Sequence, residues 1–269
     1  MRGHWQWFSP QEVAPGVFRL DDAGYVNSYL VLGSRQAALI DTGLGIADMR
    51  RVVREITPLP VTVINTHAHW DHVMGNHLFS RIMIAAAEGR WLAGPYPQDR
   101  LRRLLRNQRF TRPFPAGFSP RAYRFISSRP SVLVAGGETL DLGGRRLRIV
   151  PAPGHTAGSL IVSDDEARIA WVGDAAGTGM LYAQSPGGSD LWAWAETLDR
   201  LAAREPVLVL PGHGPPVDAA FVRQQAVEMR GLADGERTAW RRPDGLWQAD
   251  LEGFAVLLPA DYQSTRGRH

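Results

Sequence analysis

The sequence predicts an α/β fold in which two β-sheets pack face to face and helices cover their outer sides. Short apolar runs typical of strands alternate with amphipathic stretches, and this pattern occurs once in each half of the chain. The composition, 44% hydrophobic and 21% charged residues, is that of an ordinary globular protein. We expect one domain over residues 1–231 and an extension over residues 232–269 that packs on it.

The N-terminal half opens with strands and then alternates them with a helix. Apolar and β-branched runs predict strands at residues 16–20, 29–32, 37–40, 61–64 and 82–86. Gly33 and Ser34 are typical of the turn of a hairpin between the second and third of these runs. Apolar residues recur at helical spacing over residues 46–56, which predicts an amphipathic helix there.

The second half repeats this organisation. Its predicted strands lie at residues 139–142, 147–150, 160–162, 169–172 and 207–210. Gly143 and Gly144 indicate a hairpin turn between the first two. Ser189 is expected to cap a helix that runs to about Arg204, and Asp218 to cap another that runs to about Arg230.

An arginine-rich segment, residues 100–137, holds nine arginines and no acid. Leu101, Leu104 and Leu105 lie at helical spacing, whereas the prolines that follow predict irregular structure. We expect this segment to be an insertion that acts as a lid. Aromatic residues are interleaved in it, at Phe110, Phe114, Phe118, Tyr123 and Phe125.

The C-terminal extension carries Trp240, Trp247 and Phe254 around an Asp244-Gly245 turn. This arrangement predicts a β-hairpin that covers an edge or a face of a sheet.

The residue types that are missing exclude several kinds of chemistry. Without cysteine there is no disulfide, no thiolate nucleophile and no cysteine-ligated metal. All thirty basic residues are arginine, which excludes a lysine Schiff base. No apolar run approaches the ~18 residues that cross a bilayer, and the first residues lack the apolar core of a signal peptide. We therefore expect a cytoplasmic protein without a membrane partner.

The sequence His67-Ala68-His69-Trp70-Asp71-His72 is the densest cluster of potential metal ligands. On an extended segment, His67 and His69 point to the same side and can bind one ion. After a turn, Asp71 and His72 can face a second ion nearby. Nitrogen and oxygen ligands of this kind suit Zn²⁺, and they also allow iron or manganese.

Three further polar residues each follow an apolar strand: His155 in Pro-Gly-His-Thr, Asp174 in Gly-Asp, and His213 in Gly-His-Gly. Strand ends at one edge of a sheet can converge, so these residues are candidates for the same site.

With these motifs, and with Asp41-Thr42-Gly43, the chain resembles the metallo-β-lactamase superfamily over residues 16–231. The resemblance implies a four-layer αβ/βα sandwich. It implies that His67, His69 and His155 bind one metal ion, that Asp71, His72 and His213 bind a second, and that Asp174 bridges both. Asp41 is then expected to orient a ligand rather than to bind metal.

Two divalent ions, most simply zinc, would hold a bridging hydroxide that attacks an electrophilic carbon or phosphorus. Asp71 is expected to orient this nucleophile or to accept its proton. Tyr182 is a candidate donor to the developing oxyanion, with a packing role as the alternative.

The substrate is left open between three interpretations. Residues 20–45, 129–182 and 205–216 resemble acyl-coenzyme A thioesterases of the superfamily, which favours a small, anionic thioester or ester substrate. Arg102, Arg103, Arg106 and Arg109 would then bind the phosphates of coenzyme A or the carboxylates of glutathione. A glyoxalase II-like enzyme or a lactone hydrolase would use the same ligands. A phosphodiesterase or nuclease is the third alternative, although nucleic acid is not the expected partner.

Overall fold

The computed structural model describes the whole chain except residues 1, 95, 97, 108–109, 185–187 and 263–269. The chain divides into two compact units, Met1–Ile149 and Val150–His269. Each unit has its own apolar core. This boundary falls inside the predicted domain of residues 1–231, and the predicted division at residue 231 stays a prediction.

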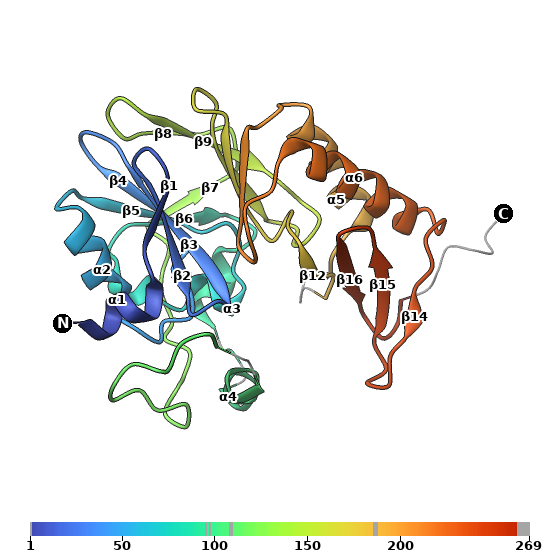
Figure 1. Cartoon of the computed structure of the whole chain (residues 1–269), viewed down its shortest axis with the longest axis horizontal. Coiled ribbons are helices and arrows are strands. Elements are labelled where there is room, and N and C mark those ends of the chain that lie inside the picture. The colour runs from blue at the N-terminus through green and yellow to red at the C-terminus, as the bar shows by residue number, and fades with distance from the viewer. Residues whose placement is uncertain (1, 95, 97, 108–109, 185–187, 263–269) are drawn as a thin grey trace. The chain divides into compact units, whose positions relative to one another are not determined.

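The first unit is built on a seven-stranded sheet with its strands in chain order, β1 to β7 (Figure 1). These strands are β1 (Gln11–Ala14), β2 (Val17–Asp22), β3 (Val26–Leu32), β4 (Ala37–Ile40), β5 (Val61–Ile64), β6 (Ile82–Ala85) and β7 (Val132–Val134). Pairing is antiparallel from β1 to β4 and parallel from β4 to β7. The predicted hairpin and the predicted strands of this half are confirmed, and the carboxyl ends of β4, β5 and β6 therefore meet at one edge.

Short helices and one hairpin complete this unit. They are α1 (Arg2–Phe8), α2 (Met49–Ile56), α3 (Trp70–Val73), the 3₁₀ turns η1 (Asn76–Leu78) and η2 (Gly89–Ala93), α4 (Gln98–Asn107), and the hairpin of β8 (Thr139–Asp141) with β9 (Arg146–Pro151), whose last two residues fall in the second unit. Helix α2 begins three residues later than predicted, because the Asp48 side chain accepts a hydrogen bond from the Arg51 backbone and caps it there.

The arginine-rich segment begins with the predicted helix, α4, but it does not stay irregular to its end. Residues 132–134 form β7, the edge strand beside β6, so this part of the prediction is wrong. The strand is only three residues long, too short for its alternation to be recognised. Aromatic residues in the stretch between α4 and β7 pack against α1. The ring centroid of Trp7 lies 5.5 Å from that of Phe110 and 5.7 Å from that of Phe114.

The second unit contains β10 (Leu160–Asp164), β11 (Ile169–Gly173) and β13 (Leu208–Pro211), with β11 parallel to β13 and antiparallel to β10. Helices α5 (Leu191–Ala202) and α6 (Ala219–Ala233) pack against each other (Figure 1). Asp218 caps α6 as predicted, accepting from the Phe221 backbone. The prediction for α5 is wrong by one residue, because its cap is Asp190, which accepts from the Ala193 backbone.

The C-terminal extension is a larger structure than the predicted hairpin. Strand β14 (Trp240–Arg241) pairs with β15 (Trp247–Leu251) across the predicted turn, and β15 pairs with β16 (Phe254–Leu258) across a second turn. Strand β16 also pairs in parallel with β12 (Gly179–Tyr182), which completes a four-stranded sheet. Phe254, Val256 and Leu258 are buried in the core of the second unit.

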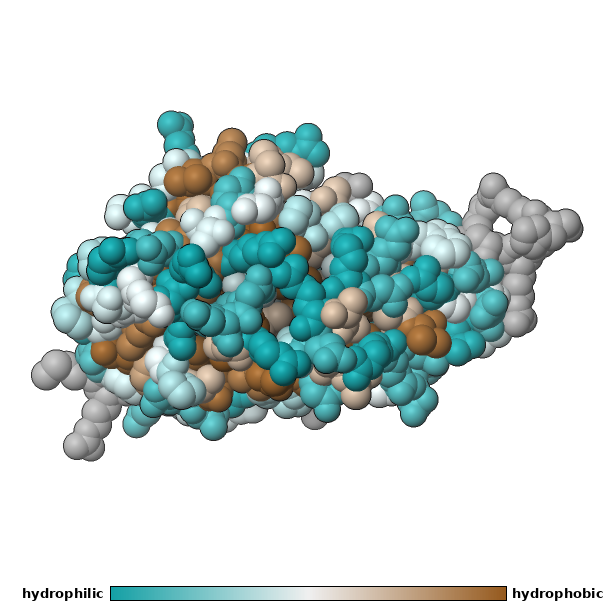
Figure 2. Space-filling model, turned by 90° about the horizontal axis from the view of Figure 1, so that it is seen from above, coloured by the Kyte–Doolittle hydropathy of each residue, from teal (hydrophilic) through white to brown (hydrophobic). Residues whose placement is uncertain are grey.

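Large apolar side chains on the surface are scattered. Trp91, Leu133, Trp192 and Trp240 belong to different elements, and Figure 2 shows hydrophobic residues as separate patches among hydrophilic ones on the face it presents. Scattered exposed apolar residues are normal for a folded domain. Among the described residues, no helix is both long enough and apolar enough to span a bilayer.

One buried acid joins the elements of the first unit. Asp22, at the end of β2, accepts hydrogen bonds from the Trp7 indole and, at 2.7 Å, from the Leu44 backbone. Gly43 is required beside it, because a β-carbon there would lie 2.3 Å from the carboxylate. Complete burial raises the pKa of Asp22 to about 7, although the hydrogen bonds from Leu44 and Trp7 oppose the rise.

This carboxyl group should make stability depend on pH. Between its ordinary pKa of 3.8 and about 7, the folded protein holds a proton that the unfolded chain has lost. The free energy of unfolding therefore falls as pH rises through this range, by up to about 1.4 kcal/mol per pH unit from this group. Asp22→Asn should make the free energy of unfolding fall less steeply with pH, as measured by urea unfolding from pH 4 to 8. Glu55→Gln, exposed on α2, is the control, and curves for Asp22→Asn parallel to wild type would contradict the assignment.

Candidate metal centre

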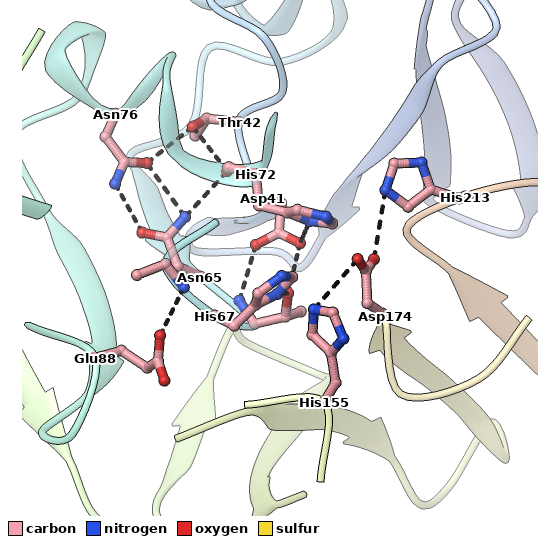
Figure 3. A network of polar contacts seen from close by, with 12 residues as sticks. Asp41, Thr42, Asn65, His67, His72, Asn76, Glu88, His155, Asp174 and His213 are labelled. Atoms are coloured by element: carbon pink, nitrogen blue, oxygen red, sulfur yellow. Dashed lines mark hydrogen bonds and ion pairs between the residues drawn. The ribbon is translucent and has the colours of Figure 1, made fainter. Parts of the chain in front are cut away.

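In the first unit, the candidate ligands follow the carboxyl end of β5 and are held by Asp41, which follows β4. The Asp41 carboxylate accepts hydrogen bonds from the Thr66 backbone at 2.8 Å, from the Thr66 hydroxyl at 2.7 Å, and from His72 Nδ1 at 2.8 Å (Figure 3). Because a carboxylate only accepts, His72 Nδ1 carries the hydrogen and Nε2 presents a lone pair, the form that binds metal. This position is the one expected for a residue that orients a ligand.

The histidine rings of this unit lie close together. The His67 ring centroid is 4.6 Å from that of His69 and 4.2 Å from that of His72. The Thr66 hydroxyl, which donates to Asp41, lies 3.1 Å from His67 Nδ1 and can accept its hydrogen. Helix α3 begins at Trp70, so Asp71 and His72 lie on its first turn. Two buried imidazoles, those of His67 and His72, and the partly buried imidazole of His69 lie beside a buried carboxylate, which suits a bound cation.

Other polar side chains hold this segment and were not found from the sequence. The Glu88 carboxylate, which is buried, accepts from the Ala68 backbone at 3.0 Å. Thr42, Asn65 and Asn76 form a second network, in which Thr42 Oγ donates to Asn76 Oδ1 and Asn76 Nδ2 donates to Asn65 Oδ1, each at 2.8 Å (Figure 3). Thr42 belongs to the Asp41-Thr42-Gly43 motif, whereas the only signal of Asn65 and Asn76 in the sequence is a polar residue in an otherwise apolar surrounding.

In the second unit, parallel pairing brings the predicted residues together. Asp174 follows β11 and His213 follows β13, and these strands pair up to Gly173 and Pro211. His155 precedes β10, whose first residues lie at the same end because β10 is antiparallel to β11. The convergence of strand ends that the sequence predicts is therefore present within this unit.

The two oxygens of Asp174 face different imidazoles. Oδ2 lies 3.5 Å from His155 Nε2, and Oδ1 lies 3.5 Å from His213 Nε2 (Figure 3). These distances exceed the ~2.9 Å of an ordinary N–H···O hydrogen bond. Two donors each ~2.0–2.1 Å from one tetrahedral ion lie about 3.4 Å apart, so the donor set fits metal binding on both sides of the carboxylate.

The His155 loop is held by the beginning of α5. Ser189 Oγ donates to the His155 carbonyl at 2.7 Å. It therefore holds this loop instead of capping α5, the role that the sequence predicts. The Trp194 ring packs edge-on against His155 with 5.3 Å between centroids. Gly154 has a φ of 143° and no room for a side chain, since a β-carbon would lie 2.4 Å from Trp194. Any larger residue would displace the loop.

Two further residues are Tyr182, the predicted oxyanion donor, and His77, a histidine outside the motifs. Tyr182 is at the end of β12, the edge strand of the four-stranded sheet, and is half exposed. Its catalytic role stays a prediction. His77 is exposed, with Nδ1 2.9 Å from the Met74 carbonyl. Among the residues described, the histidines and acids close enough to hold an ion are those of the predicted motifs.

Comparison with known sequences identifies relatives over most of the chain. The profile of the metallo-beta-lactamase superfamily matches residues 21–213. The acyl-coenzyme A thioesterase MBLAC2 of Homo sapiens is 29% identical over 228 residues, which cover 77% of this chain and 81% of that protein. The Gallus gallus protein of the same name is 29% identical over 225 residues, with the same coverage.

Solved structures show the same fold. A metallo-beta-lactamase family protein from Thermus thermophilus matches with a TM-score of 0.58 and 25% identity, over 84% of this chain and 82% of that one. The sec-alkylsulfatase Pisa1 from Pseudomonas sp. matches with a TM-score of 0.63 and 17% identity, over 83% of this chain and 41% of that one.

The contact between Asp41 and His72 gives a direct test. Asp41 has a φ of 60°, which asparagine tolerates, so Asp41→Asn changes the hydrogen bonds and spares the backbone. We expect this variant to bind Zn²⁺ about 10- to 100-fold more weakly in competition with a chelating dye, because asparagine keeps only one uncharged acceptor oxygen for the three donors of Thr66 and His72. Asp99→Asn, on the exposed surface of α4, is the control. Equal affinities of Asp41→Asn and wild type would show that Asp41 does not orient a ligand.

Proposed function

Because this chain belongs to the metallo-β-lactamase superfamily, we propose that it is a metal-dependent hydrolase of small thioester or related acyl substrates. The thioesterase relatives support the class of reaction. The observation that carries the proposal is the Asp174 carboxylate, with one imidazole 3.5 Å from each oxygen. A carboxylate in this setting suits two cations better than a hydrogen-bonding role.

The proposed ligands divide between two ions. His67, His69 and His155 would hold the first ion, Asp71, His72 and His213 would hold the second, and Asp174 would be shared by the two. We propose zinc, with iron or manganese as alternatives that the same donors accept. Hydrogen bonds from the ligands to Asp41 and Thr66 fix the tautomers, which supports binding through Nε2 of His67 and His72.

When bound, the two ions supply an activated water and polarise the scissile carbonyl. In the proposed hydrolysis the water oxygen would bond to the acyl carbon and the carbon–sulfur bond would break, and the proton that Asp71 takes from the water would pass to the leaving sulfur, which departs as a thiol. Asp71, buried on α3, orients the water and accepts its proton. Tyr182 donates to the oxyanion that develops on the carbonyl.

The arginine-rich segment supports the proposal that the substrate carries a negatively charged group remote from the scissile bond, here called the anionic handle. Some of its arginines serve the fold: Arg112 donates to the Trp7 and Asp21 carbonyls, and Arg102 donates to the Tyr123 carbonyl. Arg103 and Arg106 are exposed on α4 instead. Guanidinium groups bind phosphate in a bidentate manner, which suits coenzyme A. Arg109, also predicted to bind this handle, lies outside the described residues.

The packing of the segment weakens the nuclease alternative. Stacking of bases needs exposed aromatic faces, but Phe114 lies 5.3 Å from Phe110 and 5.0 Å from Phe118, between ring centroids. These residues pack against the core of the first unit. Lactone hydrolysis would use the same ligands and is an outcome of the assay below.

A side-by-side assay tests the reaction class. We expect the metal-loaded protein to hydrolyse an acyl-coenzyme A, and chelation or His67→Ala with His69→Ala to lower kcat/KM by at least about 1,000-fold, because activation of water is lost. The panel includes S-lactoylglutathione, an acyl-homoserine lactone and bis-p-nitrophenyl phosphate. His77→Ala, a histidine outside the motifs, is the control. Turnover of the phosphodiester alone would overturn the thioesterase proposal, and full activity of the double variant would overturn the metal mechanism.

The anionic handle is tested by substrate length. Exposed ion pairs contribute ~0.2–1 kcal/mol each, so Arg103→Gln with Arg106→Gln should raise KM for acyl-coenzyme A about twofold to thirtyfold and leave kcat unchanged. KM for the matching acyl-pantetheine, which lacks the nucleotide, should not change. Arg54→Gln, exposed on α2, is the control. An equal change for both substrates, or for neither, would reject the handle.

A further inference from the structure

A cavity of about 300 Å³ lies within the second unit, away from the strand ends that carry the metal-site motifs. Ile161 of β10 and Ile169 and Ala170 of β11 line one side, and Leu201 of α5 lines the other. From Ala170 to Asp174 the chain advances four residues along β11, or roughly 13 Å at the rise of a strand. The cavity is therefore a separate site on the same strand.

The lining combines an apolar interior with a basic rim. Arg168, Arg200 and Arg204 lie at this rim, with Asp165 as the acid that lines it. At ~30 Å³ for each non-hydrogen atom, about the volume of a water molecule, a cavity of about 300 Å³ has room for a ligand of about ten such atoms. Both properties fit a ligand with a short apolar body and one negatively charged end.

The arginines differ in how firmly they are held. Arg204 is engaged by Asp165, with both carboxylate oxygens within 3.0 Å of Nη2. Arg168 and Arg200 are half exposed, and each has a glutamate oxygen only at 3.9 Å. Such loose, exposed pairs contribute little and exchange readily with another carboxylate. Since guanidinium has five N–H donors, both residues can donate to a ligand while keeping their own hydrogen bonds to the Glu205 carbonyl and Thr197.

The helix that lines the cavity also holds the His155 loop. Thr197, a lining residue, donates to the Pro153 carbonyl at 2.7 Å. At the next residue of the loop, the Gly154 carbonyl accepts a hydrogen bond from the Asp190 backbone N–H at 2.9 Å. A ligand that fixes this part of α5 therefore restrains the loop through Thr197.

We propose that this cavity is a second binding site, for a small aliphatic carboxylate, and that its occupancy stabilises the His155 loop. The apolar side chains bind the alkyl chain, and Arg168 and Arg200 bind the carboxylate. Octanoate, with eight carbons and two oxygens, is the probe of matching size. The site does not depend on the proposed hydrolysis, and its tests measure binding and exchange rather than turnover.

Calorimetry on the metal-loaded protein tests the site. Octanoate should bind, and octylamine and 1-octanol should bind at least about tenfold more weakly because they lack the charge that arginine recognises. Arg168→Gln with Arg200→Gln should weaken octanoate about tenfold or more, and so should Ala170→Leu, which fills the cavity. Arg223→Gln, exposed on α6, is the control. Octanoate binding that both cavity variants leave unchanged would place the ligand elsewhere, including at the metal ions, and would overturn the proposal.

Hydrogen exchange tests the link to the loop. Octanoate should slow exchange of the amides of residues 154–159 in wild type, and Thr197→Val should abolish this protection while octanoate still binds. Protection that persists in Thr197→Val would reject the coupling through Thr197, and binding with no protection in wild type would reject any stabilisation of the loop.

Discussion

The hydrogen bonds of Asp41 are the constraint on which the first half of the candidate site depends. One carboxylate joins the end of β4 to Thr66, two residues after β5, and to His72, and the contact distances are 2.7 to 2.8 Å. A left-handed backbone is unfavourable for a residue other than glycine, and here it is compensated by these bonds. The histidine segment is thereby held on two strands of the sheet rather than on a flexible loop.

The sequence predicted most of the fold, because the strands of both units are apolar runs bounded by clear turns. Prediction failed where local signals compete or are short. Ser189 and Asp190 are both residue types that cap helices well; in the structure Asp190 caps α5, whereas Ser189 donates to the His155 carbonyl. Strand β12 contains four residues and is defined by pairing with the distant β16, a partner that no local pattern reveals.

The sequence allowed prediction of those residues of the candidate site whose side chains have a distinct chemistry. Histidine and aspartate at strand ends are rare enough to be noticed, and the structure places His155, Asp174 and His213 together as expected. The supporting residues were not predictable, since Glu88 and Asn76 are ordinary polar residues until burial shows what they bind. The chain has the metallo-β-lactamase fold, and substrate choice depends on parts that differ within it.

The pairing of β12 with β16 also sets an order for folding during synthesis. All strands of the first sheet are complete by Val134, so this unit can assemble while the ribosome is still translating the second. In the second unit, β12 follows closely after Asp174 but has its partner only once Phe254–Leu258 have been made. Until then β12 lacks the strand with which it pairs, and Phe254, Val256 and Leu258 are not yet present to complete the core of the second unit.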